Sequence, residues 1–213
     1  MVSPRSGALA GMIGAGVFAV VVIFLTLAQY GFMLGLGWRP LGSSDVPWPS
    51  GLALGPLGWL QVLNFAFFGL TLIVFALGLN RGVASSGRLS RVAPALLVVA
   101  GVALVLAAFE TDPHIMQGPQ TWHGAIHLLA FLLLVLSFLL ALFFWRRRLR
   151  GDPRWRGYAL YTLITALLYI LLLLASAWQW GFYLFLANVL IWIELMALRL
   201  RSVAEAASTP RVR

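Results

Sequence analysis

"HGAIHLLAFLLLVLSFLLALFFWRRRLR", residues 123–150, sets the fold class of this 213-residue chain. Residues 123–145 are almost entirely apolar, and four arginines follow within residues 146–150. A helix needs about 20 mostly apolar residues to cross a membrane. The apolar residues are continuous and do not alternate with a period of two, which favours a helix over a strand. The stretch therefore predicts a membrane-spanning helix that ends at a basic boundary.

Five more apolar runs of this kind lie at residues 9–34, 58–79, 92–109, 158–178 and 181–198. The chain is 62% hydrophobic and only 10% charged, whereas soluble domains carry about a quarter charged residues. The first run is roughly twice as long as a signal-peptide core and lacks an A-x-A site, so we expect it to be retained. The sequence predicts an all-α, polytopic integral membrane protein: a single six-helix domain over residues 1–213, with a basic tail at 199–213.

The distribution of the basic residues predicts the orientation of the six helices. All 15 basic residues are arginines, and with six spans only Arg39 falls on one side of the membrane. The other side carries Arg5, Arg81, Arg88, Arg91, Arg146, Arg147, Arg148, Arg150, Arg154, Arg156, Arg199, Arg201, Arg211 and Arg213. Positive residues concentrate in cytoplasmic loops, so both termini should be cytoplasmic. We therefore expect the arginines to face anionic lipid headgroups and not nucleic acid.

A small-residue face in the first apolar run predicts close helix packing. Gly7, Gly11 and Ala15 recur at every fourth residue, a spacing that lets a second helix approach the backbone. The neighbouring helix can belong to the same chain, to a second copy in a homo-oligomer, or to another membrane protein. The pattern carries no information about chemistry.

The connection "ETDPHIMQGPQTWHGAIH", residues 110–127, contains all three histidines and two of the six acids, and the orientation places it outside the cell. Thr121 is a suitable N-cap, so His123 and His127 should share one face of the following helix. With Asp112 they form a candidate metal site, for which zinc is the favoured ion. Two other interpretations stand beside it: a structural staple between loops, and a ligand site without metal.

Glu110 closes the third apolar run, where the dipole of a helix C-terminus disfavours a carboxylate. We therefore expect a positive group beside it, either Arg39, a protonated histidine or a bound cation. In a zinc hydrolase Glu110 would act as the general base toward a metal-bound water. In the staple interpretation, Arg39 would pair with Glu110 or Asp112.

Polar residues inside the apolar runs predict a cavity that opens toward the same face. Gln61, Asn64 and Asn188 lie at depths similar to that of His127, and with Arg39 they are the candidate ligand-binding residues. The alternative is hydrogen bonding between helices, worth about 0.6–2 kcal/mol per contact. Glu194 is the only acid well inside a run, and a small transporter is the function class in which it would act.

Four motifs resemble the bacterial membrane proteins of domain-of-unknown-function family 998. They are "FETDP" before the outer connection, "WHGAIH" after it, "GLGWRPL" after the first run and "NFAFFGL" in the second. The resemblance extends from about residue 10 to residue 198 and matches Asp112, His123 and His127 to polar positions of the family. It implies a location in the bacterial inner membrane and names no reaction.

A more distant similarity is to the ceramidase and progestin-receptor superfamily of membrane hydrolases, from which this chain departs in having six predicted spans and clustered histidines.

The first functional hypothesis is therefore an outer cavity that binds a small ligand or a lipid headgroup. A membrane-embedded zinc hydrolase that uses Asp112, His123 and His127 is the second hypothesis, and a transporter that uses Glu194 is the third. The chain has no cysteine, which excludes disulfides and thiolate metal sites. It also lacks a phosphate-binding loop and a nucleophile elbow in a suitable context.

Overall fold

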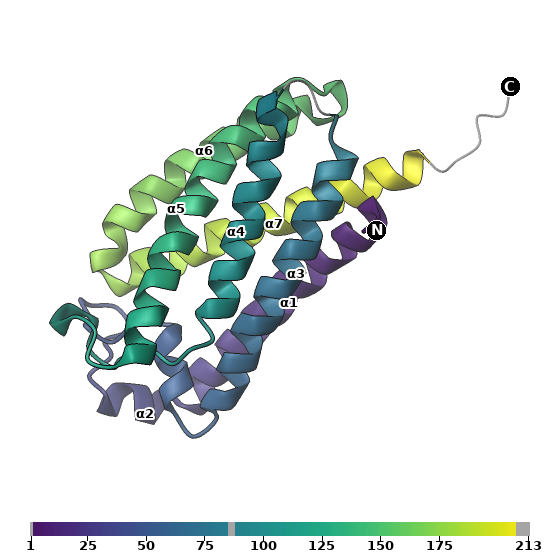
Figure 1. Cartoon of the computed structure of the whole chain (residues 1–213). Coiled ribbons are helices and arrows are strands. Elements are labelled where there is room, and N and C mark those ends of the chain that lie inside the picture. The colour runs from purple at the N-terminus through teal and green to yellow at the C-terminus, as the bar shows by residue number, and fades with distance from the viewer. Residues whose placement is uncertain (1, 85–87, 208–213) are drawn as a thin grey trace, which may run out of the picture.

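A computed structural model describes residues 2–84 and 88–207, and over these residues the chain is helical, with no strand (Figure 1). The seven α-helices are α1 (Pro4–Ala28), α2 (Tyr30–Gly35), α3 (Gly58–Gly82), α4 (Val92–Leu106), α5 (Trp122–Arg150), α6 (Arg156–Leu174) and α7 (Gln179–Ala206). The all-α prediction is confirmed.

Five helices are long and apolar enough to cross a membrane, namely α1, α3, α5, α6 with its short flanking turns, and α7. Their outward surfaces are apolar: Leu27, Leu129 and Leu174 are 72%, 67% and 76% exposed. Such surfaces suit lipid and not water. The sixth predicted span corresponds to α4, which has 15 residues and is shorter than the other five.

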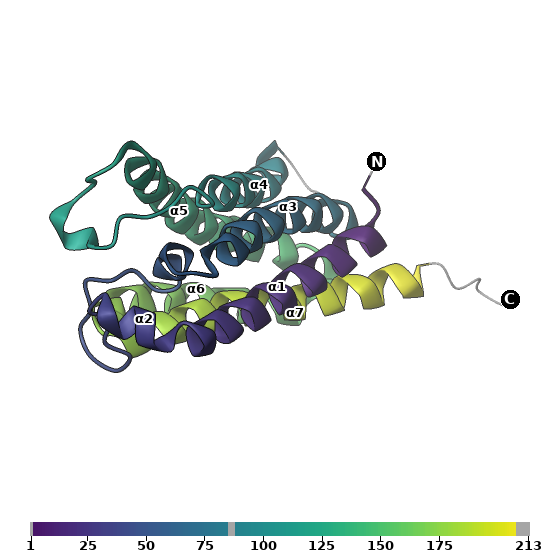
Figure 2. The same cartoon turned by 90° about the horizontal axis from the view of Figure 1, so that it is seen from below.

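The six long helices form a closed ring. Neighbours along the chain pack against each other in the order α1, α3, α4, α5, α6 and α7, and α7 packs back against α1. Figure 2 shows α1 lying between α3 and α7 when the molecule is seen from below. The interior of the ring is therefore bordered by all six helices.

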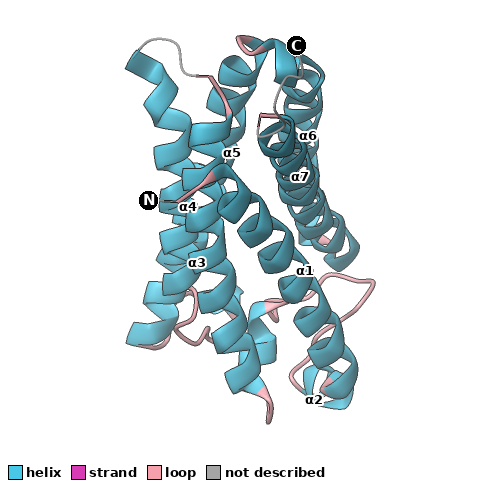
Figure 3. Ribbon diagram, turned by 90° about the vertical axis from the view of Figure 1, so that its right-hand side faces the viewer, coloured by secondary structure: helices cyan, strands magenta, loops and turns pink. Residues whose placement is uncertain are grey.

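The two ends of the ring differ in composition. One end of the ring, which we call the loop end, holds two long connections, 36–57 and 107–121, and the short connection 175–178 (Figure 3). At the opposite end, Arg81 donates a hydrogen bond to the carbonyl oxygen of Val2, and Arg199 donates one to that of Arg154. This second end, which we call the arginine end, holds both ends of the described chain and the α3–α4 and α5–α6 connections (Figure 1). The predicted separation of Arg39 from the other described arginines is thus present in the fold.

The first predicted run, 9–34, is interrupted in the structure. The helix begins at Pro4, after the N-cap Ser3, and ends at Ala28, and α2 starts beyond Gln29. The buried side chain of Gln29 donates to the carbonyl oxygen of Leu52 at 3.0 Å and accepts from the Leu57 amide at 2.8 Å. The break therefore supplies hydrogen-bond partners to connection 36–57, a role that a helical apolar pattern cannot reveal.

Other boundaries shift for local reasons. The third predicted run reaches residue 109, but α4 ends at Leu106, and residues 107–109 form turns. The last predicted run stops at residue 198, whereas α7 continues to Ala206 with an Arg201–Glu205 ion pair at i,i+4. Residues 199–206 of the predicted basic tail are therefore helical, and residues 208–213 lie outside the described part of the chain.

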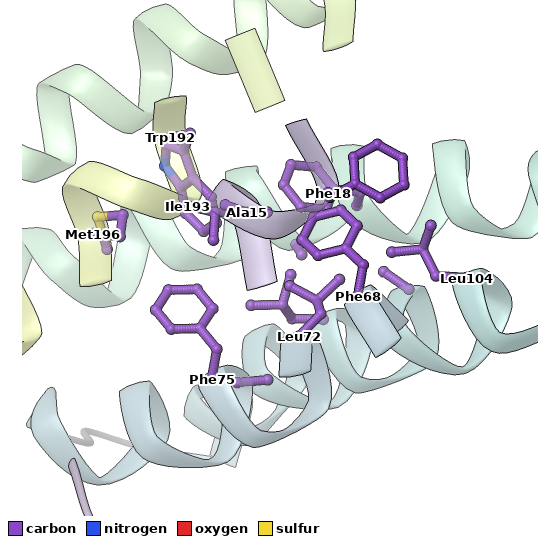
Figure 4. Packing of buried hydrophobic residues seen from close by; sticks show 14 of the residues in the cluster. Ala15, Phe18, Phe68, Leu72, Phe75, Leu104, Trp192, Ile193 and Met196 are labelled. Atoms are coloured by element: carbon purple, nitrogen blue, oxygen red, sulfur yellow. The ribbon is translucent and has the colours of Figure 1, made fainter. Parts of the chain in front are cut away.

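The small-residue face of α1 packs inside the ring. A Cβ at Gly7 would meet the backbone of Gly78 in α3, and one at Gly11 would meet Phe75 of α3 and Ala197 of α7. Ala15 is 3% exposed and lies beside Phe18 in the aromatic core of Figure 4. The close packing predicted for this face is therefore made within the chain, against α3 and α7.

One arginine at the arginine end is buried and structural. Arg148 is 6% exposed, and its guanidinium donates to the carbonyl oxygens of Asn80, Val83, Ala84 and Ser90 and to the Asn80 side chain. It thereby satisfies carbonyl groups at and just after the C-terminus of α3, which have no partner inside the helix, and joins them to Ser90 ahead of α4. The prediction that the arginines face headgroups does not hold for Arg148.

Candidate functional site

Two connections at the loop end are joined through Asp45. Its carboxylate accepts a hydrogen bond from the Met116 amide at 2.6 Å and lies 3.3 Å from Nδ1 of His114. Its carbonyl oxygen accepts from the Ile115 amide at 3.2 Å. Connection 107–121 is therefore fastened over connection 36–57 and forms a lid at the loop end.

The other end of this lid is fixed by Asp112 at the N-terminus of α5. The Asp112 carboxylate accepts hydrogen bonds from the Gln120 amide at 2.8 Å, the Thr121 amide at 3.3 Å and the Thr121 hydroxyl at 2.7 Å. The Thr121 oxygen in turn accepts from the Gly124 amide at 3.0 Å, which confirms Thr121 as the predicted N-cap of α5. We call this arrangement of Asp112, Gln120, Thr121 and Gly124 the Asp112 knot.

The knot depends on close approach and on charge. A Cβ at Gly124 would collide with the Asp112 carboxylate, so only glycine leaves room for it. Hydrogen bonds from the Gln120 amide and the Thr121 hydroxyl lower the pKa of Asp112 below its ordinary value of 3.8. The carboxylate is therefore ionised at neutral pH, with both oxygens occupied by donors from the chain itself.

His123 points its Nδ1 back toward the lid. This nitrogen lies 3.0 Å from the carbonyl oxygen of Glu110 and 3.1 Å from the Thr121 hydroxyl. A carbonyl oxygen only accepts, so the proton of the imidazole resides on Nδ1. His123 thus ties residue 110 to the first turn of α5, and only its Nε2 remains available to a ligand.

His127 lies one turn deeper, is 6% exposed, and has both ring nitrogens engaged. Its Nδ1 donates to the carbonyl oxygen of Phe109 at 2.8 Å, and its Nε2 lies 2.9 Å from the hydroxyl of Ser50. With the ring neutral, Ser50 donates to Nε2. His127 therefore connects the end of α4 to connection 36–57 beneath the lid.

A cavity of about 150 Å³ lies under the lid, and we call it the loop cavity. Besides Asp112, its polar lining consists of Ser44, Ser50, Thr111, His127, Ser176 and Gln179. Apolar side chains such as Trp48, Phe131 and Phe182 complete the wall. The loop cavity combines a mostly apolar wall with a few polar groups, as small-molecule sites do.

A second cavity of about 80 Å³ lies inside the ring of helices, and we call it the core cavity. Its wall includes seven phenylalanines, and its only polar side chains are Ser50, His127 and Tyr169. The polar atoms of these three are paired with one another or with backbone, because the Tyr169 hydroxyl donates to the carbonyl oxygen of Val135 at 3.0 Å. The two cavities share Ser50, His127, Phe131 and Phe182 as lining residues.

The predicted zinc ligands lie near one another without forming a metal site. Both carboxylate oxygens of Asp112 accept hydrogen bonds within the knot. The Nδ1 atoms of His123 and His127 face the carbonyl oxygens of Glu110 and Phe109, respectively. Among the described residues no group of three or more His, Asp or Glu side chains is arranged to hold a metal ion. The structure gives the zinc hypothesis no support.

Glu110 does not lie at a helix C-terminus beside a positive group, as the sequence had suggested. The preceding helix ends at Leu106, and Glu110 is exposed beyond its last turn, so the helix dipole that suggested a neighbouring cation does not act on it. Arg39 is exposed in connection 36–57, and no ion pair joins it to Glu110 or Asp112 in the described part of the chain. The lid is fastened by Asp45 and the Asp112 knot, and not by the predicted Arg39 staple.

Of the three intramembrane amides, Asn64 and Asn188 bind other helices and Gln61 contacts Asn64 within α3; none of them lines either cavity. Asn64 donates to Gln61 and to the carbonyl oxygen of Phe18 in α1, and Asn188 donates to that of Thr165 in α6. The interhelical alternative raised by the sequence describes these contacts. Glu194 is half-buried in α7 and lines neither cavity, although its neighbour Ile193 lines the core cavity.

The sequence alone gives no role to Ser50 and Asp45, which lie between the first two apolar runs. No local motif distinguishes them, because their partners His127 and Met116 are distant in the sequence. Pro and Gly on both sides, in "SDVPWPSG", were the only signal that this loop has a defined course.

Comparison with known proteins yields one match. The family model described as "Protein of unknown function (DUF998)" matches residues 12–201. No curated protein and no solved structure matches the chain. The matched range includes the lid, both histidines of α5 and the walls of both cavities. The chain belongs to the DUF998 family.

Proposed function

We propose that this protein binds a small ligand or a lipid headgroup in the loop cavity, at the outer face of a bacterial inner membrane. One observation carries the proposal: the loop cavity collects polar side chains from connections 36–57 and 107–121, from α5 and from the start of α7, in a chain that is 62% hydrophobic. These four segments are held together by specific hydrogen bonds: from the Met116 amide to Asp45, from the Gly124 amide to Thr121 and from the Gln179 amide to the carbonyl oxygen of Gly42. Small-molecule binding sites are typically pockets with a mostly apolar wall and a few polar groups in fixed positions.

The proposal includes the membrane orientation. We propose that α4 is the sixth span, because it packs antiparallel between α3 and α5 and the turns at 107–109 extend it toward the loop end. With an even number of spans, both termini and the arginine end face the cytoplasm. The loop cavity then opens at the outer surface, where small solutes and headgroups of the outer leaflet have access.

The test uses a variant that fills the cavity and a neighbour that does not. Ser176 lines the loop cavity, whereas Ala177 is exposed and does not line it. We expect native mass spectrometry of the protein extracted from its own membrane to reveal a co-purified molecule in the wild type and in Ala177→Phe. The molecule should be lost in Ser176→Phe. An identical set of bound molecules in both variants would show that the loop cavity is not the binding site.

A further inference from the structure

We infer that the ligand is a single-chain amphiphile with an uncharged, hydroxyl-bearing headgroup, which places its headgroup in the loop cavity and its hydrocarbon chain in the core cavity. The inference rests on the proposed function and adds the chemical class of the ligand. A monoacylglycerol is a representative of that class.

The first argument is the shared wall between the cavities. Ser50 and His127 form one hydrogen-bonded pair at 2.9 Å, and Phe131 and Phe182 form a ring pair with centroids 6.4 Å apart. All four residues line both cavities. The loop cavity and the core cavity therefore adjoin at these four side chains. Rotation of exposed or loosely packed rings is fast compared with backbone movement, so a chain can pass between them.

The second argument is the chemistry of the core cavity. The side chains at its wall come from α1, α3, α4, α5, α6 and α7, so the cavity lies inside the ring, where Phe18, Phe68, Leu72 and Leu104 meet in Figure 4. A buried water needs two to four polar partners, and the polar atoms at this wall are already engaged. An empty apolar cavity lowers stability in proportion to its volume. A hydrocarbon chain is the occupant that the wall favours, and a cavity of about 80 Å³ suits one chain better than two.

The third argument concerns the headgroup. Within the described part of the chain no arginine lines either cavity, and Asp112 is the only acidic side chain at the wall. An anionic headgroup would be desolvated without a positive partner and would face this carboxylate. Ser44 and Gln179 offer a hydroxyl and an amide that can donate and accept, and the Ser176 oxygen, whose proton is donated to the carbonyl oxygen of Leu173, can accept. Such a set matches the hydroxyl groups of a glycerol moiety and discriminates against phosphate and carboxylate.

Photo-crosslinking locates the hydrocarbon chain of the ligand. The full chain is placed in phosphatidylcholine nanodiscs with a monoacylglycerol that carries a diazirine at the end of its chain, and the crosslinked peptides are identified by mass spectrometry. We expect crosslinks at core-cavity residues of α3 and α7, such as Phe68 and Val189. Val189→Trp should abolish them by filling the cavity, whereas Ile191→Trp should not, because Ile191 is 54% exposed on the outside of α7.

The comparison probe is a lysophosphatidic acid with the same diazirine chain. We expect its crosslinking inside the ring to be at least about tenfold weaker, since burying an unpaired anion costs several kcal/mol. Equal crosslinking by both probes would refute the inferred headgroup.

Ser176→Phe separates this inference from the proposed function. If the monoacylglycerol crosslinks only lipid-facing residues, and Ser176→Phe still removes the co-purified molecule, the inferred ligand class is wrong and the loop cavity remains a binding site. If Ser176→Phe changes neither crosslinking nor the co-purified molecules, both proposals fail.

Discussion

Replacing Asp112 with asparagine tests whether the Asp112 knot holds the lid over the loop cavity. Asparagine has the same shape as aspartate, so it fits against Gly124, where an added Cβ on residue 124 would not. Its oxygen can still accept from the Gln120 and Thr121 amides, and its NH₂ can donate to the Thr121 oxygen. The variant therefore removes the negative charge and leaves the geometry in place.

The expected loss follows from the three hydrogen bonds to the carboxylate. Bonds to a charged acceptor contribute about 1.5–3 kcal/mol each, and neutral ones about 0.5–1.5 kcal/mol. The Thr121 amide is 3.3 Å from the carboxylate and is the weakest of the three. The Asp112 side chain is covered but lies near the protein surface, so the lower part of each range applies and the total loss is about 2 kcal/mol. For a chain of this size that corresponds to a fall in Tm of roughly 4–8 °C.

The assay is thermal unfolding in nanodiscs, with Glu110→Gln as the matched control. Glu110 belongs to the same connection and is exposed, so its neutralisation should change the free energy of unfolding by less than about 0.5 kcal/mol. Because the folded-state pKa of Asp112 lies below its unfolded value of 3.8, its contribution is present above that value and is lost as the pH falls through the folded-state pKa. The difference between wild type and Asp112→Asn should therefore shrink below about pH 4. An Asp112→Asn variant as stable as wild type at pH 7, or a difference that grows in acid, would refute the role of the knot.

Two further predictions concern the arginine end and the orientation. Arg148→Lys should lower the free energy of unfolding by about 2–4 kcal/mol, because one ammonium group cannot reach the five acceptors that the guanidinium binds. Arg147 is exposed, so Arg147→Lys should have almost no effect in the same thermal unfolding assay. In this cysteine-free chain, single cysteines at Ser43 and Gln117 should react with an impermeant maleimide in intact cells, and one at Ser85, outside the described residues, should not. The reverse labelling pattern would overturn the proposed orientation and the outward location of the loop cavity.

The helices could be predicted because their signals are local. A continuous apolar run and a following arginine cluster identify α5 without reference to any other part of the chain. The N-cap at Thr121 was predictable for the same reason, since its hydrogen bond is made to the Gly124 amide three residues later. The break at Gln29 was not predictable, because its cause is a pair of hydrogen bonds to residues 52 and 57.

In the candidate site, too, features set by neighbouring residues could be predicted from the sequence, and contacts between distant segments could not. Sequence spacing placed His123 and His127 on one helix face. In the structure His123 contacts the lid, and His127 contacts the lid and also lines the loop cavity. Spacing could not show that each Nδ1 is bound to a carbonyl group from the end of α4, or that Ser50 is the partner of His127. These contacts depend on how connection 36–57 folds back beneath connection 107–121, and no periodic pattern encodes that course.

The arrangement of the polar residues also explains why a charged cluster can border a site for an uncharged headgroup. Asp112 directs its charge toward amides at the start of α5, where the positive end of the helix dipole stabilises it. His127 uses both ring nitrogens on Phe109 and Ser50, so neither nitrogen is free to meet a ligand in the loop cavity. The groups left to meet a ligand are hydroxyls and one amide, carried by Ser44, Ser176 and Gln179. The titratable residues therefore build the cavity, and the neutral residues determine what it can bind.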